Sequence, residues 1–291
     1  MYKTIQACNE AYAYPIENAC GLLAVSRSSY YKWASQKLSQ RELDNIHIAE
    51  LAEKIHSESP DKGYRRIRDD LSRYYGIEIS DKKALRICRA KDIKSTIKYK
   101  NNGCTRRAAH PQYIAENILN RDFHADKPND KWLTDVTEFK YYDGIVVHKV
   151  YLSAILDLYD RRIVAFEITD RNDNKLVFDT FDTAVTVNPD AHPLFHSDRG
   201  YQYTNRVFHQ KLMKAGMTQS MSRVAHCIDN GPMEGFWGIL KRERYYGRRF
   251  TDRETLVAMI VGYIDYYNAE RLQRNLGILT PLMKNELYLA A

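Results

Sequence analysis

Near the N-terminus, apolar residues recur at the spacing of short helices. A first helix is predicted over 2–13. A second apolar stripe follows at positions i, i+3, i+4 and i+7, formed by Ile16, Ala19, Cys20 and Leu23. Ser26 can cap a third helix over 27–33, with Tyr30 facing inward. Residues 1–38 therefore predict a helix-turn-helix module, and a plain helical hairpin remains the alternative.

A second run of helical periodicity extends over residues 41–95. Its three apolar stripes are separated by Gly63 and Gly76, and Ser80 can cap the last helix. Many outward positions are basic, which suits contacts that position a protein on phosphates. Residues 96–125 lack periodicity and contain Asn-Gly and Pro, so we predict a basic and polar linker there.

From residue 126 the pattern changes to strands, and then to strands alternating with helices. Residues with high strand propensity mark three consecutive strands, over 132–139, 145–155 and 162–169. Helices and shorter strands then alternate as far as residue 245. The sequence predicts an α/β core over 126–245 with a mixed five-stranded sheet, followed by a helical extension over 246–291 that packs against it.

The segment 229–241 predicts a capped helix with two different faces. Asp229 or Asn230 can accept hydrogen bonds from the amides of its first turn. Its apolar stripe consists of Met233, Phe236, Trp237 and Leu240. Glu234 and Lys241 lie on a second row, so we expect Glu234 to stand over a cleft, while the two tryptophans of the core motifs are expected to be buried.

Two further acidic residues lie on strand-like runs, Asp135 within a strand and Asp198 just past a strand end. Two Asp and one Glu supply the hard oxygen ligands that Mg²⁺ prefers. Two such cations about 3.5–4 Å apart can stabilise the entering and leaving oxygens of a phosphodiester without a nucleophilic side chain or a His base. Most of the 37 acidic residues must be surface charges or helix caps. Asp135, Asp198 and Glu234 are nevertheless the candidate metal ligands, and His196 is expected to be a structural neighbour.

The net charge of +7 is concentrated in the first third of the chain. Residues 1–107 contain 21 Lys and Arg against 13 Asp and Glu, whereas residues 108–291 contain 23 against 24. This asymmetry is typical of a polyanion-binding module attached to a near-neutral catalytic body. A merely solvated basic face is the alternative.

Composition also excludes several classes of protein. No apolar run approaches the ~20 residues needed to cross a bilayer, and the N-terminus lacks an apolar signal segment. We therefore expect no membrane partner and a cytoplasmic, nucleoid-associated location. The five cysteines show neither a Cys-x-x-Cys pair nor another zinc-ligand spacing, so no zinc is expected.

Four motifs stand in order along the chain. They are Trp-x-Thr-Asp-Val-Thr from Trp132, His-Ser-Asp-Arg-Gly-x-Gln-Tyr from His196, Asp-Asn-x-x-x-Glu-x-Phe from Asp229, and Tyr-Tyr-Asn-Ala-Glu-Arg from Tyr266. Asp198 and Glu234 are separated by 35 residues, and Lys241 follows seven positions after Glu234. This spacing is similar to that of DDE transposases and retroviral integrases. As a set, the motifs resemble the OrfB-type transposases of the IS three family of bacterial insertion elements over nearly the whole chain.

The resemblance implies a ribonuclease H-like catalytic core preceded by all-α helix-turn-helix modules. It implies a transposase that cleaves DNA at element ends and joins strands through Asp135, Asp198 and Glu234, with Mg²⁺ as cofactor and Mn²⁺ as a substitute. The implied partners are double-stranded DNA, in the form of terminal inverted repeats and target, further copies of the chain, and an upstream OrfA product or an OrfAB fusion. The start at Met1 is taken to indicate the second reading frame alone.

The resemblance also implies roles for residues around the acidic triad. Lys241 matches a basic residue that touches the terminal DNA, and Gln202, Tyr203 and Asn230 match positions near the active site. The DNA-contacting residues of the helical modules are expected to be Arg27, Ser28, Tyr31, Lys32, Arg65 and Arg66.

Two other functions remain open from the residues alone. One is a catalytically silent DNA-binding regulator derived from a transposase, and the other is a ribonuclease H-like nuclease that cuts without joining. The intact triad argues against the first, and the helix-turn-helix start and Lys241 argue against the second.

Overall fold

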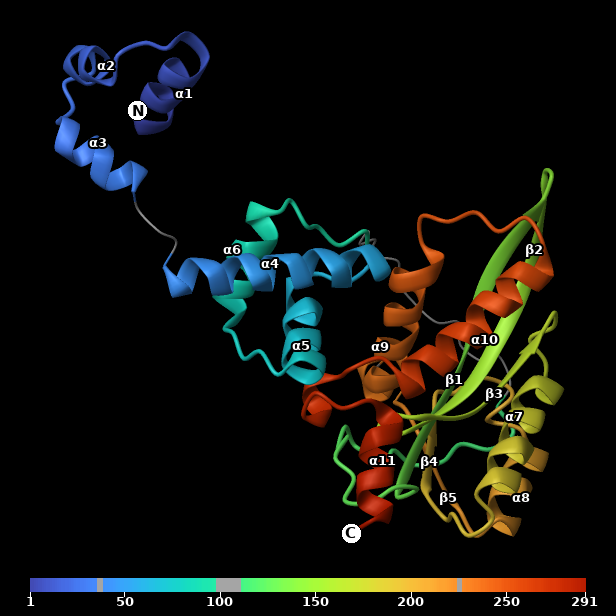
Figure 1. Ribbon diagram of the computed structural model, residues 1–291. Coiled ribbons are helices and arrows are strands. Elements are labelled where there is room, and N and C mark those ends of the chain that lie inside the picture. Colours follow the sequence, from blue (N-terminus) through green and yellow to red (C-terminus); the bar gives the residue numbers. More distant parts are fainter. Residues whose placement is uncertain (36–38, 98–110, 224–226) are drawn as a thin grey trace.

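A computed structural model describes residues 1–35, 39–97, 111–223 and 227–291 of the chain. Two groups of three helices precede a five-stranded sheet and the helices that cover it, and the first group lies apart from the rest (Figure 1). The helices of the two groups are α1 Tyr2–Tyr12, α2 Ile16–Leu22, α3 Arg27–Ala34, α4 Gln40–Glu58, α5 Tyr64–Tyr75 and α6 Asp81–Ala90. The described helices include none that is long and apolar enough to span a membrane.

The first group has its own small core. Ile5, Ala19, Cys20 and Tyr30 are buried together, one or two from each helix. The Ser26 hydroxyl accepts a hydrogen bond from the Ser29 amide, which caps α3 as the sequence predicted. The three predicted helices and the inward position of Tyr30 are therefore confirmed.

The second group packs around the predicted apolar stripes. Ile48, Ala52 and Ile55 of α4 are buried against Ile67 and Leu71 of α5. Ser39 and Ser80 cap α4 and α6, and Gly76 ends α5 in the left-handed conformation with φ 65°. A glycine adopts this conformation without the steric cost of a Cβ atom, so the chain turns sharply there.

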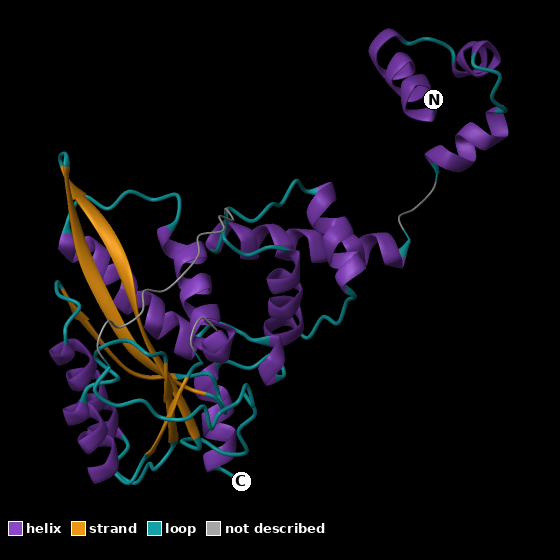
Figure 2. Ribbon diagram, turned by 180° about the vertical axis from the view of Figure 1, so that it is seen from behind, coloured by secondary structure: helices purple, strands orange, loops and turns teal. Residues whose placement is uncertain are grey.

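The five strands form one mixed sheet in the order β3-β2-β1-β4-β5 (Figure 2). They are β1 Lys131–Asp143, β2 Val146–Asp157, β3 Ile163–Thr169, β4 Leu194–Ser197 and β5 Thr218–Met221. β1, β2 and β3 are antiparallel neighbours, whereas β4 runs parallel to β1 and β5 parallel to β4. The first strand is thus central, and this order is the ribonuclease H-like arrangement that was expected.

Helices cover both faces of the sheet. These helices are α7 Asn174–Val187, α8 Arg206–Lys214, α9 Gly231–Leu240, α10 Arg253–Ala269 and α11 Pro281–Leu289. On one face, Val177 and Phe181 of α7 and Phe208 of α8 are buried with Trp132 and Phe195 from the sheet. On the other face, the apolar stripes of α9 and α10 are buried with residues of β1 and β2. The predicted packing of the C-terminal extension against the core is confirmed.

The segment expected as a linker differs from the prediction in its second half. Residues 98–110 lie outside the described part of the chain, but Ala115 and Leu119 are buried against the core. The amides of Ile118 and Leu119 donate to the Ser220 hydroxyl, and the Tyr113 amide donates to the carbonyl of Thr204. Residues 111–125 therefore pack along the core. The prediction of a linker was wrong for these residues, because an extended segment can bury single residues without any periodic pattern in the sequence.

The second helical group is fastened to the core by buried charges. Arg66 of α5 forms an ion pair of 3.0 Å with Glu243, and Arg271 reaches the same carboxylate at 2.8 Å. The hydroxyl of Tyr263 donates to Glu243, and Arg244 lies 3.3 Å from Asp61. Since the Glu243 side chain is only 4% exposed, its charge depends on these partners rather than on water.

We predict that Glu243→Gln lowers the free energy of unfolding by about 3 kcal/mol, because it leaves two buried guanidinium groups without their shared carboxylate. Urea unfolding of the variant and the wild type measures this difference. Glu286→Gln, at an exposed position of α11, is the matched control and should change stability by less than about 0.5 kcal/mol. Equal midpoints for all three proteins would contradict a structural role of the network.

Candidate active site

Asp135 lies near the middle of the sheet, on its central strand. In the antiparallel register of β1 and β2 it stands opposite Ala154, and it is half-buried. One of its carboxylate oxygens accepts a hydrogen bond of 3.0 Å from the indole N–H of Trp237. Trp237 was expected only as a core residue, so the structure adds a polar function to its packing.

Asp198 follows the end of β4, which runs parallel to β1. Leu133 stands opposite His196 in this ladder, so the same register extended by two residues brings Asp198 beside Asp135. The amide of Gly200 donates to the Asp198 carboxylate at 2.8 Å. A Cβ atom on Gly200 would lie 3.0 Å from that oxygen and 3.2 Å from Gln202, so a larger residue would have to displace these side chains by a few tenths of an ångström.

Glu234 is exposed in the first turn of α9. Met233, Phe236, Trp237 and Leu240 hold this helix against the sheet, as the apolar stripe predicted. Burial, and then the negative charge of Asp198, raise the pKa of Glu234. The helix therefore presents its carboxylate toward Asp198.

The three acidic groups repel one another. Burial, followed by the charges of Asp198 and Glu234, raises the pKa of Asp135 to about 8. Burial also raises the pKa of Asp198. Among the residues that the structure describes, no three His, Cys, Asp or Glu side chains are grouped closely enough to hold a metal ion as they stand. The three carboxylates are thus near enough to raise one another's pKa, but they are not arranged as the ligands of one ion.

His196 and Tyr203 support the site from the buried side. Both nitrogens of the fully buried His196 ring lie within hydrogen-bond distance of serine hydroxyls, those of Ser220 and Ser222. Burial lowers the pKa of His196 to about 4, so the ring is neutral, as expected for a structural neighbour. The Tyr203 hydroxyl lies 3.3 Å from that of Thr134, the residue before Asp135.

The expected cap of α9 is wrong in its details. Asn230 occupies the N-cap position, but its side chain makes no capping hydrogen bond and instead donates to the Thr134 carbonyl at 3.0 Å. The Asp229 carboxylate accepts from the guanidinium groups of Arg121 and Arg223 at 2.6 and 2.9 Å. Charged donors bind a carboxylate more strongly than backbone amides do, so these contacts replace the cap.

Lys241 and Gln202 lie where the sequence placed them, beside the acidic residues. The Lys241 ammonium donates to the Thr137 hydroxyl at 2.6 Å and lies over the Phe139 ring. Because alternate residues of a strand share a face, Thr137 points to the same side of β1 as Asp135. Gln202 is buried and donates to the side chain of Asn172.

The residues expected to touch DNA fall into two sets. Arg27, Ser28, Tyr31 and Lys32 are all exposed on α3, where Arg27 pairs with the exposed Glu17. Arg65 is exposed over 67% of its side chain. Arg66, by contrast, is bound by Asp61, Glu243 and the Tyr266 hydroxyl. Its predicted DNA contact is corrected, since the guanidinium is already used inside the protein.

Comparison with known proteins adds three family models. Residues 125–227 and 234–283 match two models described as integrase core domain, and residues 42–101 match an HTH-like domain. The residues matched by the first two models include Asp135, Asp198 and Glu234.

Two curated proteins are similar in sequence. A putative transposase, InsK, of insertion sequence element IS150 from Escherichia coli K12 is 34% identical over 95% of this chain and 95% of its own. An uncharacterized transposase-like protein of Haemophilus influenzae is 40% identical over 71% of this chain and 93% of its own. Among solved structures, the HTLV-2 integrase catalytic core domain in complex with magnesium is 17% identical, with a TM-score of 0.43, over 56% of this chain and 99% of that one.

The contacts of Asp229 predict a pH-dependent contribution to stability. The hydrogen bond from Arg223 holds the pKa of this fully buried carboxyl well below its usual range. Such a group stabilises the fold above its unfolded pKa, near pH 4, and the contribution is lost as the pH falls toward the folded pKa. We expect Asp229→Asn to cost about 1–2 kcal/mol at pH 7, since the arginines are partly exposed.

Urea unfolding of both proteins between pH 7 and pH 3 tests this. The difference should begin to shrink below about pH 4. Asp182→Asn, which breaks the exposed pair with Lys211, is the control and should have little effect at any pH. A constant difference across this range would show that packing rather than charge sets the cost.

Proposed function

The chain belongs to the transposases of the IS three family of insertion elements, which carry an integrase catalytic core, and we propose that Asp135, Asp198 and Glu234 are its catalytic residues and metal ligands. The observation that carries this proposal is the mutual effect of the three acids. The pKa of Asp135 is raised to about 8 by burial and by the other two carboxylates. A bound cation would neutralise these like charges and lower the pKa of all three groups.

The donor set fits a hard divalent cation. All three side chains offer carboxylate oxygens, the ligands that Mg²⁺ and Mn²⁺ accept, and no thiolate takes part. Glu234 is exposed at the edge of α9, so it can approach the two aspartates by side-chain rotation. When bound, the cations would lower the pKa of an attacking water or hydroxyl and stabilise the leaving oxygen.

Other residues of the chain would position the three acids and the DNA. Asp135 is positioned by Trp237, Asp198 by the Gly200 amide, and the two strands fix their separation. Asn230 ties the start of α9 to β1 beside Asp135. The Lys241 ammonium, which donates to Thr137, would hold a phosphate next to the reacting one. Gln202, four residues after Asp198, links this segment to Asn172.

The proposed reaction has two steps. Water first attacks a phosphodiester at the element end and frees a 3′-hydroxyl, and that hydroxyl then attacks a phosphodiester of the target DNA. Each step forms one P–O bond and breaks another, so neither step needs an oxidant or an external energy source. Positioning and charge stabilisation therefore account for the catalysis.

DNA recognition is assigned to the helical groups. α3 exposes Arg27, Ser28, Tyr31 and Lys32, and its length suits a helix that enters the major groove of the terminal inverted repeat. Arg65 of the second group is exposed and adds a phosphate contact. We place the boundaries of the two modules at 1–38 and 41–95, the core at 126–245 and the helical extension at 246–291.

Assembly is proposed from the reaction. Two element ends and one target must meet, which requires more than one copy of the chain, and an upstream OrfA product or an OrfAB fusion would supply further DNA binding. The reaction would take place on DNA in the cytoplasm.

We predict that Glu234→Gln, Asp135→Asn and Asp198→Asn each abolish cleavage and joining of labelled duplexes that carry the element ends, in Mg²⁺ or Mn²⁺. DNA affinity should be nearly unchanged, because the substitutions remove negative charge and no phosphate contact. EDTA should abolish the wild-type reaction. Glu286→Gln, on exposed α11, is the matched control and should stay active. Full activity of the Glu234 variant would refute the assignment.

Metal binding can be followed without activity. Since Trp237 donates to Asp135, Mn²⁺ should quench part of the tryptophan fluorescence of the wild type and less of it in Asp135→Asn. Cleavage without joining would favour a nuclease or a missing OrfA partner, and DNA binding without chemistry would favour a regulator.

A separate prediction concerns α3. Arg27→Ala and Lys32→Ala should weaken binding of an end-containing duplex and reduce the slope of log affinity against log salt by about one each. Fluorescence anisotropy at several salt concentrations measures both quantities. Lys3→Ala on α1 removes one exposed charge of the same module outside α3. If that control changes the slope as much as the α3 variants do, α3 is not the recognition helix.

A further inference from the structure

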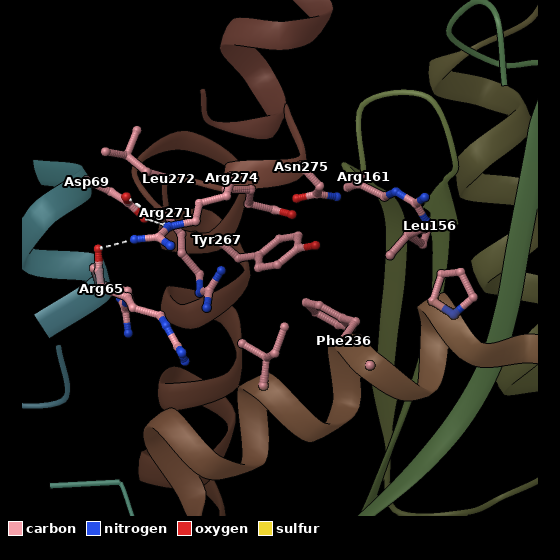
Figure 3. A pocket seen from close by; sticks show the side chains of 15 residues that line it. Arg65, Asp69, Leu156, Arg161, Phe236, Tyr267, Arg271, Leu272, Arg274 and Asn275 are labelled. Carbon is pink, nitrogen blue, oxygen red and sulfur yellow. Dashed lines mark hydrogen bonds and ion pairs between the residues drawn. The ribbon is translucent and has the colours of Figure 1, made fainter. Parts of the chain in front are cut away.

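A cavity of about 370 Å³ lies between the second helical group and the core (Figure 3). Gly235 and Ile239 of α9 form part of its wall, and Glu234 does not line it. Arg65 reaches it from α5, and Arg161 from the turn between β2 and β3. The cavity is thus separate from the acidic site, although both use the same helix.

The charges beside the cavity do not balance. Two separate networks of ion pairs within 4.0 Å lie beside it, namely Arg66, Arg244 and Arg271 with Asp61 and Glu243, and Arg65, Arg68 and Arg274 with Asp69 and Asp81. Each network therefore has one more arginine than it has carboxylates. A partly buried excess of positive charge attracts an anion.

Arg161 adds a further positive charge. Among the described residues it lies within 4.0 Å of no carboxylate, and its guanidinium donates to the carbonyl of Phe123 at 3.2 Å. Burial lowers its pKa, and the more distant charges of Asp157 and Asp160 offset this only in part. Its backbone lies in the left-handed region, with φ 64°.

Of these arginines, Arg65 lies farthest from its nearest carboxylate. Its closest carboxylate, Asp81, lies 3.9 Å away and is bound by Arg274 at 3.0 Å. In Figure 3, Arg65 and Arg161 lie on opposite sides of the cavity. Their side chains therefore line the cavity from two directions.

We propose that this cavity is an anion site that receives phosphate groups of the DNA backbone, contacted by Arg65 on one side and by Arg161 on the other. Guanidinium groups match the geometry of phosphate oxygens and keep their charge at any physiological pH. The DNA source of the phosphate rests on the function proposed above, whereas the anion site itself does not. DNA bound there would contact the flank of α9 that carries Gly235 and Ile239, while Glu234 serves the reaction on another flank.

The test compares Arg65→Gln, Arg161→Gln and the double variant with the wild type. Fluorescence anisotropy with a mixed-sequence duplex gives the affinity at several salt concentrations. Each single substitution should weaken binding several-fold and reduce the salt slope by about one, and the double variant by about two. Arg161→Lys keeps the charge and should keep the slope, which separates loss of charge from loss of fold.

A matched control measures the general effect of net charge. Arg206→Gln removes one exposed arginine at the start of α8, outside the cavity. The proposal is overturned if the slope of log affinity against log salt falls no further in a cavity variant than in Arg206→Gln. Glu234→Gln in the same assay should keep the wild-type slope, so failure of the anion site and failure of the catalytic assignment give different results.

Inorganic pyrophosphate distinguishes DNA from a free anion as the source of the phosphate. It should raise the Tm of the wild type but not that of the Arg65→Gln/Arg161→Gln variant. If pyrophosphate acts in this way while the DNA salt slope is unchanged, the cavity serves a small anion and the DNA assignment is wrong. If neither the Tm nor the slope responds to the substitutions, there is no anion site.

Discussion

Electrostatic repulsion among three carboxylates is the constraint on which the rest of this structure depends. Asp135 lies on β1, Asp198 directly follows the parallel strand β4, and Glu234 approaches Asp198 from a helix. Burial makes the repulsion stronger, because water no longer screens it. Only a rigid framework can hold such groups near one another, and the framework here is a sheet covered by helices on both faces.

Helix α9 connects this constraint to the rest of the molecule. Its apolar stripe is buried in the core, and Trp237 binds Asp135. The side chain of the N-cap residue, Asn230, ties the start of the helix to β1. A different flank lines the arginine-rich cavity. Helix α9 therefore contacts the acidic site, the sheet and the cavity beside the second helical group. A displacement of any of these would change the position of Glu234.

The basic residues serve two purposes that composition does not separate. Some of the positive charge of the first third is exposed, as on α3, where Arg27 and Lys32 face solvent. Another part is used inside the protein, as Arg66 shows by binding Asp61 and Glu243. The same side-chain chemistry suits both, since a guanidinium binds a carboxylate and a phosphate in similar ways. Burial decides between them, and burial is a property of the fold.

The sequence by itself determined the elements and the acidic residues of this protein. Helical and strand periods are local, so they revealed the capped helix after Ser26, the central strand around Asp135 and the apolar stripe of α9. The spacing from Asp198 to Glu234 singled out the three acidic residues that are proposed as metal ligands. Tertiary structure alone decided which side chains meet: Arg66 with Glu243, Asp229 with Arg121 and Arg223, and Trp237 with Asp135. Several of these partners are about a hundred or more positions apart in the chain, so no local pattern encodes their contact, and their energies depend on a burial that exists only once the chain has folded.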